Sequence, residues 1–193
     1  MLCAIVLAAG EGSRFGGAKQ GALYNGEPML RLVLQRAVEL CGPASYVVLG
    51  AHAAEIAPVL GRSAATVVNN ANWREGLASS IRAGIERLPG SCSGALLLLA
   101  DQPAVTLSDL QRLADAWRRA PQFTVAAQYA GTVGVPAIFP RAEFGALLQL
   151  RGDRGAQQLL RRNPERLISV PVASAAVDVD TKEDLQRTDQ RES

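Results

Sequence analysis

Hydrophobic positions along the chain follow two periods. Short apolar runs at residues 2–9 and 95–100 predict strands buried on both faces. Between them, the stretch that begins at Pro28 repeats apolar residues at the helical period until Gly42 ends it. This alternation predicts a parallel sheet with helices on its faces. Further strands are predicted at 46–49, 66–68, 123–129 and 167–172, and further helices at 53–60, 76–88 and 106–117.

The second half of the chain has a less regular pattern. Residues 131–136 are expected to form a loop, and two short helical stretches flank residues 151–155. Asp180 and Thr181, with Asp184 after them, predict the start of a C-terminal helix. We expect one domain over residues 1–193, with a tail at 188–193 that lacks fixed structure.

Composition narrows the classes of partner. The 193 residues carry 20 Lys and Arg against 18 Asp and Glu, and the net charge of +2 favours neither nucleic acid nor a membrane surface as partner. No apolar run approaches the roughly 20 residues of a membrane span, and the first ten residues do not resemble a signal peptide, so a cytoplasmic protein is expected. Three widely spaced cysteines predict neither a disulfide framework nor a zinc site.

A glycine-rich loop directly follows the first strand. Gly10, Gly12, Gly16 and Gly17 alternate with polar residues, and Arg14 and Lys19 add positive charge. Glycines allow backbone N–H groups to turn toward a phosphate, which the two cations would neutralise. The loop fits neither a dinucleotide fingerprint nor a Walker A motif. We favour a phosphate site over the alternative, a solvated surface turn.

Acidic residues follow two other strands. Asp101 stands where the 95–100 strand ends, and ligands of open α/β sheets bind at the carboxyl ends of the strands. Mg²⁺ takes one or two carboxylates together with phosphate oxygens, which Asp101 facing the glycine loop could supply. Asp178 or Asp180 could complete the shell, although Asp180 could equally cap a helix.

These residues resemble a known family. Residues 7–16, with Lys19 after them, are similar to the LAAGxSxRMG…K signature of MobA-like nucleotidyltransferases. The remaining motifs resemble the MocA-like branch of molybdenum cofactor cytidylyltransferases: W-x-x-G-x-x-x-S within 72–81, LADQP at 99–103, G-x-P at 134–136, GDxGA at 152–156 and DIDTPEDL at 178–185.

The resemblance implies a three-layer α/β/α fold of the GT-A, Rossmann-like type with a mostly parallel central sheet. It also implies Mg²⁺-dependent transfer of CMP from CTP to a phosphate of the molybdenum-pterin cofactor (molybdopterin), with a molybdoenzyme as client and with release of pyrophosphate. Carried over, the nucleotide-binding residues are Leu7, Ala8, Ala9, Gly10, Gly12, Ser13, Arg14, Lys19, Ser79, Ser80 and Asp101. The catalytic residues are Arg14, Lys19 and Asp101, the metal ligands Asp101 and Asp180, and the acceptor-binding residues Gly134, Pro136, Asp153 and Arg154.

Three departures from the family pattern keep alternatives open. Phe15 replaces Met, Lys182 replaces Pro, and residues 132–133 stand where many molybdopterin cytidylyltransferases carry Arg. The last change concerns the acceptor more than the chemistry. Another nucleotide or acceptor, such as a sugar phosphate, and a non-catalytic cofactor-binding protein are the competing hypotheses.

Overall fold

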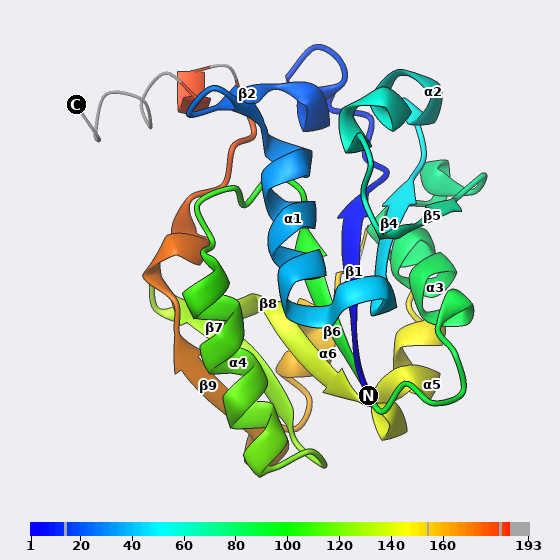
Figure 1. Ribbon diagram of the computed structural model, residues 1–193. Coiled ribbons are helices and arrows are strands. Elements are labelled where there is room, and N and C mark those ends of the chain that lie inside the picture. The colour runs from blue at the N-terminus through cyan, green and yellow to red at the C-terminus, as the bar shows by residue number, and fades with distance from the viewer. Residues whose placement is uncertain (14, 154, 182, 186–193) are drawn as a thin grey trace.

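The computed structural model describes residues 1–13, 15–153, 155–181 and 183–185 (Figure 1). The tail expected at 188–193 lies outside these residues. The strands are β1 (Leu2–Ala8), β2 (Leu23–Tyr24), β3 (Glu27–Pro28), β4 (Ser45–Leu49), β5 (Thr66–Asn69), β6 (Gly94–Leu99), β7 (Thr124–Tyr129), β8 (Thr132–Pro140) and β9 (Leu167–Pro171). The α-helices are α1 (Met29–Cys41), α2 (Ala53–Ile56), α3 (Leu77–Arg87), α4 (Leu107–Arg119), α5 (Phe144–Leu148) and α6 (Gln157–Leu160).

A seven-stranded sheet forms the middle layer, in the order β5-β4-β1-β6-β8-β7-β9. Its first four strands pair in parallel, and β8 runs antiparallel to both of its neighbours. Helices α1 and α4 cover one face, and α3, α5 and α6 cover the other (Figure 1). The mostly parallel three-layer α/β/α fold expected from the sequence is confirmed.

Strand β1 shows why the apolar run is continuous. Ala4 and Val6 enter the core beneath α1 and α4, whereas Cys3 and Ile5 enter the core beneath α3 and α5. Because successive side chains of a strand point to opposite faces, a strand covered on both faces needs apolar residues at every position. Close packing also explains Gly84 on α3, where an added Cβ would lie 2.7 Å from the Ile5 side chain.

The prediction of a loop at 131–136 is wrong. Ala130 and Gly131, both with positive φ, form the turn of a hairpin, and β8 begins at Thr132. The register with β7 shifts between Ala126 and Ala127, so that a bulge accommodates Pro136, which has no N–H to give the ladder. Pairing with strands on both sides therefore overrides the local loop signals.

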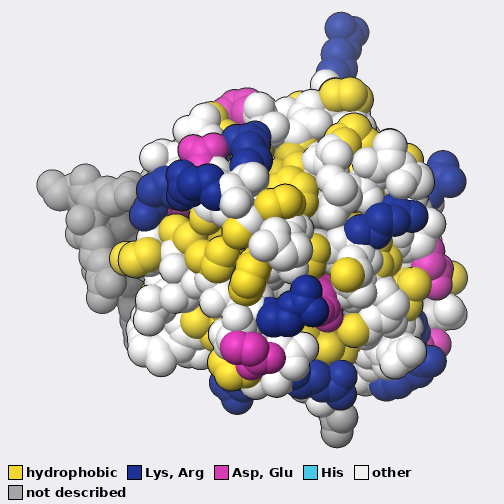
Figure 2. All heavy atoms as spheres, turned by 90° about the horizontal axis from the view of Figure 1, so that it is seen from below, with side chains coloured by type: hydrophobic (Ala, Val, Ile, Leu, Met, Phe, Trp, Pro, Cys, Tyr) yellow, Lys and Arg dark blue, Asp and Glu magenta, His cyan; other side chains and the backbone are white. Residues whose placement is uncertain are grey.

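Three further features concern the cysteines, the helices and the charged surface. Cys3 and Cys92 are buried, Cys41 is partly buried, and all three are free. Within the described part of the chain no helix has the length and apolar character needed to cross a membrane. Figure 2 looks from below at the end of the sheet that carries the N-terminus, and there the Lys and Arg side chains are scattered in separate groups.

Candidate active site

A cleft of about 540 Å³ lies at the carboxyl ends of β1 and β6. This volume is within the range of small-molecule sites. The loop after β1 forms one side and the loop after β6 forms the other, as expected for an open α/β sheet. We call residues 10–13 and 15–18 the glycine wall, and Asp101 and Asp180 with the loops that carry them the acidic wall.

The glycine wall folds on itself. The carbonyl of Gly12 accepts the N–H groups of Phe15 and Gly16, both at 2.9 Å. Gly12 has a φ of +66°, and a Cβ there would lie 2.2 Å from the carbonyl oxygen of Gly17. Only glycine fits this position. By contrast, a Cβ on Gly10 or Gly16 would meet no protein atom within 4 Å, which leaves space at the loop surface.

Two side chains fasten the glycine wall to the scaffold. Buried Gln20 donates to the carbonyls of Ala8 at 3.2 Å and Gly10 at 2.8 Å, which fixes the exit from β1. The Nε2 atom of His52 lies 3.0 Å from the carbonyl of Glu11, so this nitrogen carries the proton and donates. His52, the only histidine of the chain, therefore holds the loop in place.

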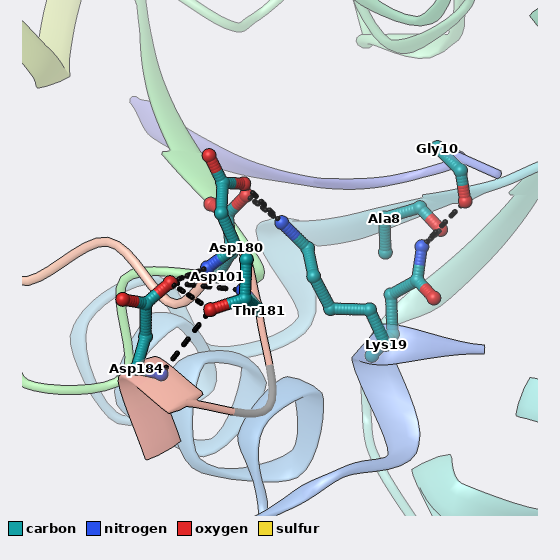
Figure 3. A network of polar contacts seen from close by, with 8 residues as sticks. Ala8, Gly10, Lys19, Asp101, Asp180, Thr181 and Asp184 are labelled. Carbon is teal, nitrogen blue, oxygen red and sulfur yellow. Dashed lines mark hydrogen bonds and ion pairs between the residues drawn. The ribbon is translucent and has the colours of Figure 1, made fainter. Parts of the chain in front are cut away.

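Lys19 connects the two walls (Figure 3). Its Nζ atom lies 2.7 Å from Asp101 Oδ2 and 2.9 Å from Asp180 Oδ1. Burial alone would lower the pKa of Lys19, but the charge of Asp101 and hydrogen bonds to both carboxylates outweigh burial and raise it. Lys19 is therefore a fixed positive charge at any pH near neutrality.

The acidic wall has the oxygen donors that a hard cation needs. Both carboxylates lie within hydrogen-bond distance of one ammonium, so they are close enough to share one cation. The other oxygen of Asp101, Oδ1, is buried and has no hydrogen-bond partner among the described residues. The described residues contain no cluster of three or more His, Cys, Asp or Glu suited to a metal. Two carboxylates fit Mg²⁺ that takes its remaining ligands from substrate phosphates and water.

Thr181, not Asp180, caps the C-terminal helix. The hydroxyl of Thr181 accepts the N–H of Asp184 at 3.3 Å, and the carboxylate of Asp184 accepts the N–H of Thr181 at 2.9 Å. This reciprocal arrangement leaves the Asp180 side chain for Lys19. Of the two candidates that the sequence left open, Asp180 lines the cleft and faces Lys19.

Trp73 forms the far end of the cleft from the acidic wall. The guanidinium of Arg74 stacks over the Trp73 ring at 4.2 Å from its centroid. Trp73 packs so closely on the β4 exit that a Cβ on Gly50 would lie 2.7 Å from its Cβ. Beside it, the buried amide of Asn70 donates to the hydroxyls of Ser79 at 2.8 Å and Ser80 at 3.1 Å. This end therefore offers an aromatic ring and the ordered hydroxyl of Ser80, which lines the cleft.

The loop before α6 packs against the start of α3 and lines the cleft there. The N–H of Ala78 donates to the carbonyl of Gly152 at 3.1 Å, and Asp153 lies against Gly76, where a Cβ would be 2.3 Å from its Oδ1. Gly76, with a φ of +97°, is therefore needed both for its own turn and for the approach of this loop. Asp153 reaches the cleft by this route.

The structure brings together most of the residues predicted from the sequence. Those that line the cleft are Leu7, Ala8, Ala9, Gly10, Gly12, Ser13, Lys19, Ser80, Asp101, Asp153 and Asp180. Arg14 and Arg154 lie outside the described residues. Ser79, Gly134 and Pro136 are absent from the described lining. Ser79 instead donates to the carbonyl of Gly76 at 2.8 Å.

Gly134 and Pro136 have structural environments instead. A Cβ on Gly134 would lie 2.4 Å from the hydroxyl of Tyr129, so the glycine makes room for that ring. Pro136 borders a small cavity that Arg36 and Gln102 also line. The sequence analysis missed Gln20, His52 and Asn70 as supports and Trp73 as a lining residue, and only Trp73, by its place in a motif, carried a signal that could have found it.

Comparisons with known proteins agree with this geometry. Residues 4–167 match the family described as MobA-like NTP transferase domain. Rv0371c from Mycobacterium tuberculosis H37Rv is 29% identical, with a TM-score of 0.84 and 96% of each chain covered. Its complex with manganese aligns with a TM-score of 0.78 at 27% identity, over 97% of each chain.

Two further relatives differ in their named activities. A curated protein of Paenarthrobacter nicotinovorans, nicotine blue oxidoreductase, is 27% identical over 95% of this chain and 94% of its own. A nucleotidyl transferase from Methanothermobacter thermautotroptrophicus shares the fold, with a TM-score of 0.84 at 23% identity over 99% of this chain and 97% of its own. The family match covers most of the chain, including the glycine wall and Asp101. The chain belongs to the MobA-like NTP transferase family and is a nucleotidyltransferase.

Proposed function

We propose that this protein transfers CMP from CTP to a phosphate of the molybdenum-pterin cofactor, in the cytoplasm, and releases pyrophosphate with the help of Mg²⁺. The observation that carries the transfer chemistry is Lys19 held between Asp101 and Asp180, opposite a glycine wall with open space at Gly10. A polyphosphate and a cation fit between these walls. The choice of CTP and of the acceptor rests on the resemblance of the motifs.

The residues of the cleft align the two phosphates. N–H groups of the glycine wall bind the triphosphate, and Lys19 turns from the carboxylates to the phosphate oxygens. An oxygen of the acceptor phosphate attacks the α-phosphorus, the bond from the α-phosphorus to the bridging oxygen breaks, and pyrophosphate leaves. Mg²⁺, when bound by Asp101 and Asp180, neutralises the charge of the triphosphate and of the leaving group. An ionised phosphate nucleophile needs no strong general base.

The far end of the cleft suits the base and the acceptor. A pyrimidine stacks on Trp73 or on the Arg74 guanidinium above it, and Ser80 reaches the ribose or the base. Asp153 lines the cleft beside Gly76 and contacts the acceptor. The environments of Gly134 and Pro136 favour a packing role for both. Of the described residues predicted to bind the acceptor, this leaves Asp153 for that role.

Pyrophosphate release tests the proposal directly. Each of the four nucleoside triphosphates is supplied with Mg²⁺, with and without molybdenum-loaded pterin cofactor, and Asp101→Asn serves as the inactive control. Release that needs both CTP and the cofactor supports the proposal. Release with another nucleotide, or with a sugar phosphate as acceptor, shows a different specificity, and nucleotide binding without release indicates a non-catalytic protein.

The name of the Paenarthrobacter relative adds a second candidate, an oxidoreductase. A dinucleotide cofactor also carries phosphates that the glycine wall could bind. The same protein preparation is therefore tested for oxidation of NADH and NADPH in the presence of a quinone-like dye. Oxidation that survives Asp101→Asn, without pyrophosphate release by the unaltered protein, would favour the oxidoreductase.

A further inference from the structure

The two carboxylates of the acidic wall come from distant parts of the sequence. Asp101 follows β6, and Asp180 follows the 3-10 helix η7 (Ala173–Ala176). The N–H of Val179, next to Asp180, donates to the carbonyl of Asp101 at 3.0 Å. The segment that carries Asp180 is therefore attached to the loop that carries Asp101.

Gln102 makes a second attachment between the same segments. Its side chain is 2% exposed, and Nε2 donates to the carbonyl of Ala175 at 3.0 Å. Because a carbonyl can only accept, the amide orientation is fixed by this bond. A third bond joins the hydroxyl of Ser174 to Asp109 Oδ2 at 2.7 Å, at the start of α4.

Helix α1 also holds the loop that follows Asp101. The guanidinium of Arg36 donates to the carbonyl of Val105 at 2.7 Å and also to the carbonyl of Pro103. The loop after Asp101 is thereby fixed to the body of the protein. Gln102 and Val179 attach the C-terminal segment to this loop, in addition to its bonds to β7 and α4.

We propose that Gln102 is a positioning residue for the metal, because it holds the segment of Asp180 against the loop of Asp101. The inference rests on the proposed function, in which both carboxylates bind the metal. Lys19 offsets the repulsion between the two carboxylates, and once Lys19 turns to the phosphates the segments that carry them must still hold them close together. Without the Gln102 amide, the Ala175 carbonyl loses its donor, the segment moves away, and Asp180 is withdrawn from the shared cation.

The test measures binding of Mn²⁺ alone to the whole protein, by the loss of the free-ion signal in electron paramagnetic resonance. Gln102→Met keeps the side-chain volume and removes the donor. Removing an outer partner of a metal ligand weakens metal binding by roughly 10-fold to 100-fold. Gln102 acts one step further out, through the backbone at Ala175, so we expect about 10-fold for Gln102→Met, the low end of that range. Asp180→Asn sets the benchmark for complete loss of the second carboxylate.

Ser45→Ala is the matched control. Ser45 is fully buried, and its hydroxyl donates to the Ala37 carbonyl at 3.0 Å, so the variant also deprives a carbonyl of a side-chain donor, but between α1 and β4. It should lower the melting temperature and leave the dissociation constant of Mn²⁺ unchanged. Ser174→Ala loosens the same segment at a partly exposed position and should weaken Mn²⁺ binding about 2-fold to 3-fold.

Four outcomes decide the proposal. Weaker Mn²⁺ binding in Gln102→Met than in Ser45→Ala, at similar melting temperatures, supports it. Equal binding in these two variants overturns it, as does a wild-type protein that binds no Mn²⁺. If Gln102→Met does not fold, unchanged binding by Ser174→Ala overturns it. Mn²⁺ binding with no nucleotidyl transfer would overturn the proposed function and leave the role of Gln102 standing.

Discussion

The two walls of the cleft are built in different ways. The glycine wall is held mainly by its own backbone, around the Gly12 carbonyl, with Gln20 and His52 at its base. The acidic wall is held by side chains from several elements, through Gln102 and Arg36. The glycine wall exposes backbone and empty space, whereas the acidic wall presents charges at fixed separation.

This difference suggests that the glycine wall serves nucleotide binding and the acidic wall serves catalysis. A glycine-rich loop with open space beside it lets a phosphate approach the backbone closely and contributes affinity. Charges placed before the reaction stabilise the transition state, because no energy is spent on reorganising them. We therefore expect changes in the acidic wall to lower kcat and changes in the glycine wall to raise KM.

The largest effect is expected at the centre of the acidic wall. Asp101→Asn removes one of the two charges that the proposal assigns to the metal, and Lys19→Met removes the cation that faces both carboxylates. Each should lower kcat by about 10³-fold, since a metal or a fixed charge contributes several kcal/mol to such a transition state. Pyrophosphate release at saturating nucleotide and metal measures the effect. A rate within 10-fold of wild type would remove that residue from the catalytic assignment.

Gly12→Ala is the strongest change available in the glycine wall. The new Cβ would stand 2.2 Å from the Gly17 carbonyl in a backbone conformation that alanine rarely adopts, so the loop must rearrange. Nucleotide affinity should fall by about 100-fold, because several phosphate contacts depend on this loop. Calorimetric titration with CTP measures the loss. Gly90→Ala, in an open surface turn, is the control and should bind as wild type.

Gly10→Ala tests whether a ligand fills the open space beside the glycine wall. Its added methyl would meet no protein atom within 4 Å, so the fold should be unaffected. Weaker CTP binding, by about 10-fold, at an unchanged melting temperature would show that a ligand fills the space beside Gly10. Unchanged affinity in this variant would place the phosphates elsewhere.

Trp73 lies at the end of the cleft to which the proposal assigns the base of the nucleotide. Stacking of a base on an aromatic ring contributes about 1 to 3 kcal/mol, so Trp73→Ala should raise the KM for the nucleotide by about 10-fold or more, with kcat little changed. Trp73→Phe keeps a ring and should lose less. In a Trp117→Phe background Trp73 is the only tryptophan of the chain, so quenching of its fluorescence by CTP reports contact directly. A fall in kcat instead of affinity would contradict the division between the walls.

The sequence predicted those features of the fold and the site that depend on residues next to one another in the chain. The run of β1, the glycines after it and Asp101 at the end of β6 lie at sites that local pattern alone identifies. The sequence could not show that Gly134 lies beneath Tyr129, or that Gln102 reaches Ala175, because these contacts join segments brought together only by the sheet. For the same reason the sequence predicted a loop over the first part of β8, at 132–136: its glycine and proline are local signals, whereas its pairing is not local.

The smallest effect concerns the support of the acidic wall at low pH. The carboxylate of Asp109 caps α4 and accepts the Ser174 hydroxyl. Burial alone would raise its pKa, but hydrogen bonds from Thr106, Ser174 and Arg112 lower it from 3.8 to about 2. Since the folded pKa lies below the unfolded one, the stabilisation is complete above about pH 4 and is lost as the pH falls toward 2. It should amount to about 1 to 2 kcal/mol after allowance for solvent screening, and about half of it should be lost between pH 7 and pH 3, which urea unfolding at these two pH values measures. Asp109→Asn should reduce the stability difference between these two pH values. An equal difference in wild type and variant would show that Asp109 does not link the acidic wall to α4 through its charge.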